Sequence, residues 1–100
     1  MHASINKEEA RAAIRRIIQT GTVTFTGHAR KEMSNDHLGE IDVLNVLRGG
    51  WVEGPEWENG GWRYKVCTQK ITVVVEFECE DDMSIEQELD EVVIITAWRL

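Results

Sequence analysis

The spacing of hydrophobic residues changes once along this 100-residue chain, at the glycine pair Gly49-Gly50. Before the pair, apolar residues recur every three or four positions, which is the period of an α-helix. After it, they alternate with polar residues, which is the period of a strand that buries one face. Helices first and strands second predict an α+β domain of two layers. We expect residues 1–100 to form a single domain around one core.

Three helices are expected in the first half of the chain. The first follows Asn6, which forms a capping-box pattern with Glu9, and ends at Gly21, where we expect a left-handed stop. Thr26 is the expected cap of a short second helix, which the segment "SNDHLG" ends. Residues 22–25 fit either a brief strand or an extended lead-in. The third helix covers "EIDVLNVLR" and should turn four apolar residues inward: Ile41, Val43, Leu44 and Leu47.

Three strands are predicted over residues 62–68, 71–79 and 92–99, and a short one at Trp51-Val52. We therefore expect the N-terminal helices to pack on a three- to four-stranded antiparallel sheet. If Gln69-Lys70 is a two-residue turn, Arg63 lies opposite Glu76, and opposite charges on neighbouring strands attract. A turn longer by one residue would move Arg63 away from that carboxylate.

The charge of the chain is −7 and unevenly placed. Residues 49–100 carry four bases and twelve acids, and nine acids without a base lie between Glu76 and Glu91. Such a field repels phosphate, so the net charge disfavours RNA as a partner. The segment "ECEDDMSIEQELDE" lacks the glycine and the acid spacing of a calcium-binding loop. We expect a solvated loop there, or an acidic arm that binds a basic partner.

The two cysteines form no C-x-x-C pair and have no histidine cluster nearby, so neither a metal site nor a disulfide framework is indicated. No apolar run approaches the roughly 18 residues of a membrane-spanning helix. The N-terminus lacks an apolar signal segment. These features predict a cytoplasmic protein with no membrane association.

Four segments, "FTGHARKEM", "EIDVLNVLRGG", "WRYKV" and "VVIITAWR", resemble a bacterial family of unknown function with an H-A-x-x-x-M signature. That family is similar in layout to the RelE/ParE/MqsR superfamily of toxin–antitoxin systems. The resemblance covers residues 20–100. It implies a RelE/MqsR-like fold, a toxin-side role, and a cognate antitoxin of the zinc-finger or helix-turn-helix type as partner. Two departures stand out: "SNDHLG" replaces the family's basic R-G-I stretch, and this chain is acidic.

RelE-like enzymes are metal-independent endoribonucleases, so the resemblance implies RNA cleavage without a cofactor. In this sequence His28, in the first turn of a helix, would serve as base or acid. Tyr64 would assist it, and arginines and lysines would hold the phosphate. The predicted catalytic residues are His28, Tyr64, Arg63 and Arg99. The predicted phosphate-binding residues are Arg30, Lys31 and Lys65.

Each of these residues also has a structural explanation. A cross-strand pair with Glu76 would neutralise Arg63, and Arg30 and Lys31 fit a solvated helix face. The four tryptophans fit the core and its rim. The alternative function is therefore a catalytically inactive protein-binding module of the same fold, which uses an acidic surface.

Overall fold

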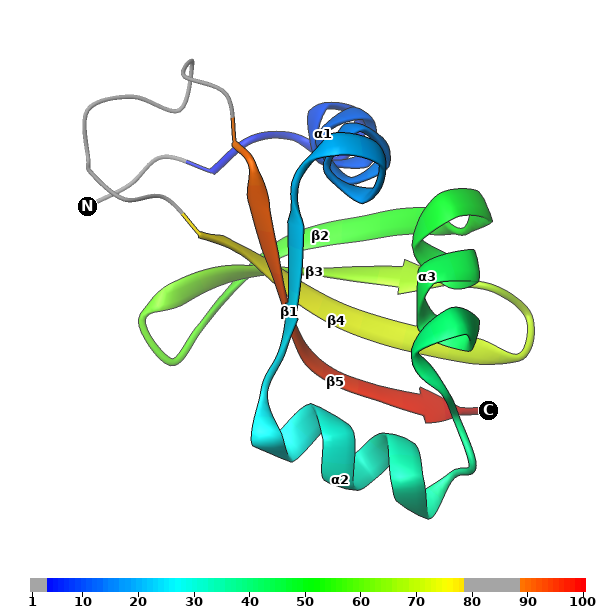
Figure 1. The fold of residues 1–100 in the computed structure, drawn as a ribbon. Coiled ribbons are helices and arrows are strands. Elements are labelled where there is room, and N and C mark those ends of the chain that lie inside the picture. The colour runs from blue at the N-terminus through cyan, green and yellow to red at the C-terminus, as the bar shows by residue number, and fades with distance from the viewer. Residues whose placement is uncertain (1–3, 79–88) are drawn as a thin grey trace.

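The computed structural model describes residues 4–78 and 89–100 of the chain. Residues 79–88, which include Cys79 and most of the acidic segment, lie outside the described residues. The described elements follow one another in a fixed order (Figure 1): α1 (Lys7–Thr20), β1 (Thr22–Phe25), α2 (Gly27–Asn35), α3 (Glu40–Gly49), β2 (Trp51–Glu58), β3 (Gly61–Cys67), β4 (Ile71–Glu78) and β5 (Glu91–Arg99).

Helix α1 begins as predicted and ends differently. The Glu9 amide donates to Asn6 Oδ1 at 2.8 Å and the Asn6 amide donates to Glu9 Oε1 at 2.9 Å, so the capping box is confirmed. The left-handed stop at Gly21 is wrong, because its φ is −109° and the backbone continues extended into β1. A Cβ at Gly21 would collide with the carbonyl oxygen of Asp90. Gly21 is therefore needed for the close approach of two backbones.

Helix α3 buries a narrower face than predicted. Val43, Val46 and Leu47 point into the core, as expected for a stripe with helical spacing. The prediction that Ile41 faces inward is wrong, because this side chain is 73% exposed. At roughly 100° per residue, Ile41 lies on the side of the helix opposite that stripe.

The strands form one five-stranded sheet in the order β1-β5-β4-β3-β2. The predicted α+β class is confirmed, but the expected three- to four-stranded antiparallel sheet differs in strand number and polarity. Strand β1 runs parallel to β5, with Thr22 beside Glu91 and Phe25 beside Ile94. Strand β2 extends through the turn-rich segment because a register irregularity between Glu53 and Glu56 absorbs Gly54-Pro55.

The register of the β3–β4 hairpin is the one predicted for a two-residue turn. Lys65 pairs with Val74 and Cys67 with Thr72. The β2–β3 hairpin closes at Asn59-Gly60, whose φ values of 51° and 84° fit a tight turn with two left-handed residues.

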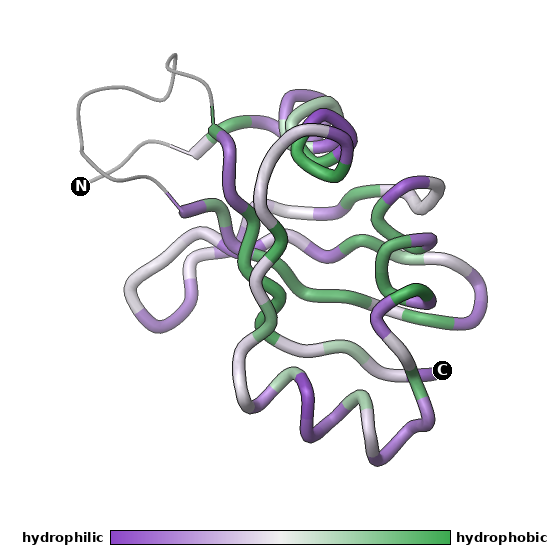
Figure 2. Tube along the Cα trace, in the orientation of Figure 1, coloured by the Kyte–Doolittle hydropathy of each residue, from purple (hydrophilic) through white to green (hydrophobic). Residues whose placement is uncertain are grey.

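Helices α1 and α3 lie on one side of the sheet, and α2 lies beside the part of β5 that β1 does not cover. Helices α1 and α3 contribute to the same core as the alternate residues Val66, Val73 and Val75 of the strands. Helix α2 lies along the second half of β5, where β1 no longer covers the edge (Figure 1). Figure 2 shows the hydrophobic positions concentrated in the central strands, while α2 and the β2–β3 turn are mainly hydrophilic. In the described part of the chain, no helix is long and apolar enough to cross a membrane.

Candidate functional site

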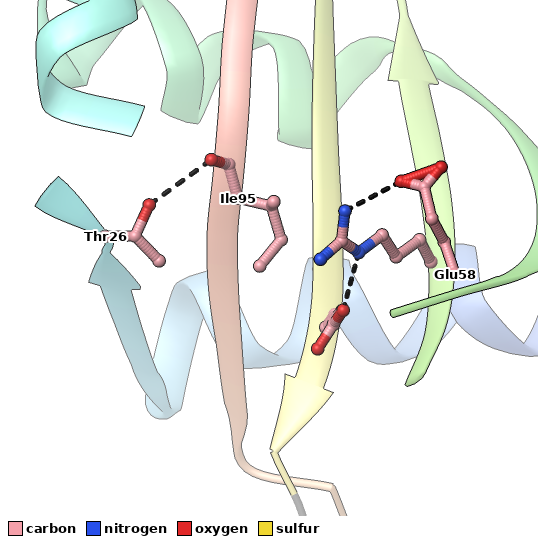
Figure 3. Close-up of polar contacts among 5 residues, drawn as sticks. Thr26, Glu58 and Ile95 are labelled. Carbon is pink, nitrogen blue, oxygen red and sulfur yellow. Dashed lines mark hydrogen bonds and ion pairs between the residues drawn. The ribbon is translucent and has the colours of Figure 1, made fainter. Parts of the chain in front are cut away.

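His28 lies in the first turn of α2, next to the cap of the helix. Thr26 accepts a hydrogen bond from the Ala29 amide at 2.9 Å and donates from its hydroxyl to the Ile95 carbonyl at 3.2 Å (Figure 3). The Thr26 amide also donates to the carbonyl of Ile94 at 3.1 Å. The start of α2 is thus fixed to β5, and His28 projects from it as an exposed side chain.

The two cations that follow His28 are in different states. Arg30 donates from one terminal nitrogen to Glu40 Oε2 at 2.8 Å, and its guanidinium carbon lies 4.9 Å from the centre of the Phe25 ring. It therefore links α2, α3 and β1. Lys31 is exposed and takes part in none of the ion pairs found among the described residues. Of the two, Lys31 is the cation available to a ligand.

Arg63 is held by two carboxylates on neighbouring strands. Its Nε donates to Glu76 Oε2 at 2.7 Å, and a terminal nitrogen donates to Glu58 Oε1 at 2.8 Å (Figure 3). The hydrogen bond to Glu76 raises the pKa of Arg63 above its ordinary value. This is the cross-strand pair expected if Gln69-Lys70 forms a two-residue turn. Because both partners are anions, the charge of Arg63 is neutralised by the sheet itself.

Tyr64 faces the core. Its hydroxyl donates to the Ile5 carbonyl at 2.6 Å and accepts from the Ile5 amide at 3.2 Å. Its ring packs edge to face against Phe77, with centroids 5.4 Å apart. Burial raises the pKa of Tyr64 above its ordinary value, which makes proton release at neutral pH less favourable. The side chain joins the segment before α1 to the sheet.

Arg99 lies at the opposite end of α2 from His28. Its amide donates to Asp36 Oδ2 at 2.9 Å, and its Nε donates to the Asp36 carbonyl at 2.9 Å. A terminal nitrogen donates to the carbonyl of His37 at 3.2 Å. Eight helical steps of about 1.5 Å separate His28 from Asp36, so the imidazole and this guanidinium are anchored roughly 12 Å apart along the axis.

The structure does not gather the four predicted catalytic residues. His28 is at the start of α2, Arg99 is at its end, and Tyr64 is in the core. Arg63 belongs to the other face of the sheet, because residues alternate between faces along β3. A base, an acid and a phosphate-binding cation need to reach one substrate together. This arrangement places them at four separate positions.

A different surface emerges from the register, on the sheet face turned away from the core. We call it the open sheet face. Register and alternation place on it the residues Trp51, Glu53, Glu56, Glu58, Arg63, Lys65, Cys67, Thr72, Val74, Glu76, Glu78, Glu91, Val93, Thr96 and Trp98. None of these belongs to the core cluster or to the side chains packed against it. The set holds six carboxylates and two cations, so the open sheet face is acidic.

The open sheet face has an aromatic end and an acidic end. One row of paired residues joins Trp51, Cys67, Thr72 and Trp98. Cys67 and Thr72 are buried within this row although they belong to the open sheet face. The burial of Cys67 raises the pKa of its thiol. At the other end, Glu78 and Glu91 pair across neighbouring strands and add two negative charges.

Sequence reasoning missed this face because three of its six carboxylates, Glu53, Glu56 and Glu58, lie on β2. Gly54-Pro55 interrupts the alternation of this strand, which places Trp51, Glu53, Glu56 and Glu58 on one face. The period-two pattern therefore cannot be recognised in the sequence. The pattern becomes visible when the segment is divided at Gly54-Pro55, because both halves then alternate toward the same face.

No family model, curated protein or solved structure matches this chain. In residues 4–78 and 89–100, no group of three or more His, Cys, Asp or Glu side chains is placed to hold a metal ion. The likeness of "FTGHARKEM" and "VVIITAWR" to the bacterial family with the H-A-x-x-x-M signature stays a prediction.

Proposed function

We propose that this chain is a non-catalytic protein-binding module of a bacterial toxin–antitoxin pair, and that its open sheet face binds a basic segment of the partner protein. The observation that carries the proposal is the charge of that surface, which holds six carboxylates and two cations. One of the two cations, Arg63, is already paired with Glu58 and Glu76. The toxin–antitoxin assignment rests on the sequence motifs.

The charge of the face selects the class of partner. An acidic surface raises the rate of encounter with a cationic protein and opposes the approach of a phosphate backbone. An antitoxin that binds DNA carries lysines and arginines that contact phosphate. Carboxylates spaced along β-strands can bind the same side chains, so a DNA-binding antitoxin has the right chemistry to be the partner.

Removal of two unpaired carboxylates tests this proposal. Glu56 and Glu78 are exposed on the open sheet face and enter no ion pair among the described residues. The double variant Glu56→Gln, Glu78→Gln should bind a lysine-rich octapeptide about fivefold to thirtyfold more weakly at low salt, since each charge contributes roughly 0.5–1 kcal/mol at an exposed site.

The matched control removes two charges from the helices, with Glu8→Gln and Glu32→Gln. It should weaken binding much less, because neither residue lies on the open sheet face. Fluorescence anisotropy of the labelled peptide measures both constants. Equal loss in the two double variants would overturn the proposal, because it would mean that only the net charge matters.

An endoribonuclease toxin is the second candidate function. It is favoured by one observation: His28 and Lys31 are both exposed on the first turns of α2 and belong to none of the ion pairs among the described residues. If the chain cleaves RNA, its expression should arrest bacterial growth, and His28→Ala should remove the arrest. Arrest that persists in His28→Ala, or no arrest in the parent chain, would eliminate this candidate.

A further inference from the structure

Trp51 and Glu53 form an ordered pair at the aromatic end of the open sheet face. The indole Nε1 donates to Glu53 Oε2 at 2.9 Å. Residues two apart on a strand point to the same side, so the pair follows from the geometry of β2. The hydrogen bond fixes the plane of the indole beside the carboxylate.

Both members of the pair retain capacity for a ligand. Trp51 is 49% exposed, so much of its ring is open to solvent. A carboxylate offers about four acceptor positions, and the indole occupies one of them. Glu53 takes part in no ion pair within the described parts of the chain. An aromatic surface beside an unpaired carboxylate is suited to a cation.

We propose that Trp51 and Glu53 form a subsite for an arginine side chain of the partner protein, an inference that rests on the function proposed above. The guanidinium stacks on the indole and donates to the free acceptor positions of Glu53. Arginine is favoured over lysine because a planar guanidinium can stack and donate at the same time. An ammonium group keeps more of its hydration and has no plane to stack.

The positive charge of Lys65 allows the electrostatic part of the proposal to be tested. It lies opposite Glu53 in the β2–β3 register, is exposed, and enters no ion pair among the described residues. Its charge therefore opposes an incoming cation. Lys65→Gln should strengthen binding of an arginine peptide by about twofold to threefold, because it removes a positive charge and keeps a polar side chain on the same face.

The experiment compares two labelled octapeptides, one of alternating glycine and arginine and one of alternating glycine and lysine. The parent chain should bind the arginine peptide about threefold to tenfold more tightly, as expected for one stacked and hydrogen-bonded guanidinium. Trp51→Ala should reduce binding of the arginine peptide to the level of the lysine peptide. Trp51→Phe should retain part of the preference, because it keeps an aromatic face. Glu53→Gln should weaken both peptides.

Trp57→Ala is the matched control. Trp57 is 53% exposed, similar to Trp51, but it lies on the helix side of the sheet. There it packs against Trp62, with the ring centroids 5.1 Å apart. Its removal should leave the arginine preference unchanged. The subsite is overturned if Trp51→Ala and Trp57→Ala behave alike, or if the parent chain has no preference for arginine. Those results leave the proposed function standing whenever the Glu56, Glu78 double variant still loses binding.

Discussion

At the scale of single residues, Tyr64 shows how a candidate catalytic group is used for stability. Its hydroxyl satisfies both the amide and the carbonyl of Ile5. Tyr64→Phe keeps the buried ring and leaves these two backbone groups without their partner. We expect the free energy of unfolding to fall by about 1–2 kcal/mol. Urea denaturation measures it, and an unchanged midpoint would show that the Ile5 contact contributes nothing in solution.

Tyr64 also predicts how stability depends on alkaline pH. Burial raises the pKa of this phenol above its ordinary value, so the unfolded chain loses the proton at a lower pH than the folded chain. The stabilisation is complete below the unfolded pKa and is lost as pH rises through the folded value. The parent chain should therefore lose stability above about pH 10 more steeply than Tyr64→Phe.

Tyr64 is the sole tyrosine of the sequence, so the ultraviolet absorbance of tyrosinate reports its titration directly. The folded chain should titrate at a higher pH than the chain in urea. Coinciding titration curves would contradict the buried position of the hydroxyl.

At the scale of elements, α2 replaces a missing strand. Strand β1 pairs with β5 only as far as Ile94, and the rest of that edge is covered by α2. Asp36 closes the arrangement, because its Oδ2 accepts from the Arg99 amide. The helix is about 13 Å long, close to the length of the last four steps of β5.

Asp36→Ala should therefore loosen α2 from the end of β5. The Arg99 amide would lose its acceptor, and we expect a loss of about 0.5–1.5 kcal/mol in unfolding free energy. Hydrogen exchange at the Arg99 amide should accelerate in the same variant. Asn35→Ala, one residue earlier and exposed, is the control. Equal exchange rates in the two variants would contradict the contact.

Local and long-range elements differ in how well the sequence predicts them. The Asn6–Glu9 cap and the Thr26 cap depend on residues close along the chain, and both were predicted. The Arg63–Glu76 pair depends on one short turn, and it was expected for one of the two possible turn lengths. The pairing of β1 with β5 joins Thr22 to Glu91, and no pattern in a four-residue segment indicates such a distant partner. Strand β2 was predicted only at Trp51-Val52, because Gly54-Pro55 interrupts its alternating pattern.

The candidate site was predicted less well than the fold. Residue type indicated that His28, Arg63, Tyr64 and Arg99 are chemically suited to acid–base and phosphate chemistry. Whether such groups meet depends on the faces of the sheet and the ends of α2, which follow from long-range pairing. The open sheet face became apparent only when the register of four strands was combined.

At the scale of the whole molecule, the chain separates a helix-covered face from an acidic face. The net charge of −7 is concentrated in the second half of the sequence, which supplies four of the five strands. Among the described residues of this half, six of the seven acids lie on the open sheet face. The negative field attracts a basic partner over a distance, and the aromatic end of the open sheet face supplies contacts at close range.

The proposed function requires that the open sheet face binds the basic segment of the partner. Chemical-shift mapping of ¹⁵N-labelled protein during titration with the glycine–arginine octapeptide tests it most directly. We expect the largest changes at the Trp51 indole N–H and at the amides of Glu53, Lys65 and Val74. Changes concentrated on the first turns of α2, around His28 and Lys31, would contradict it.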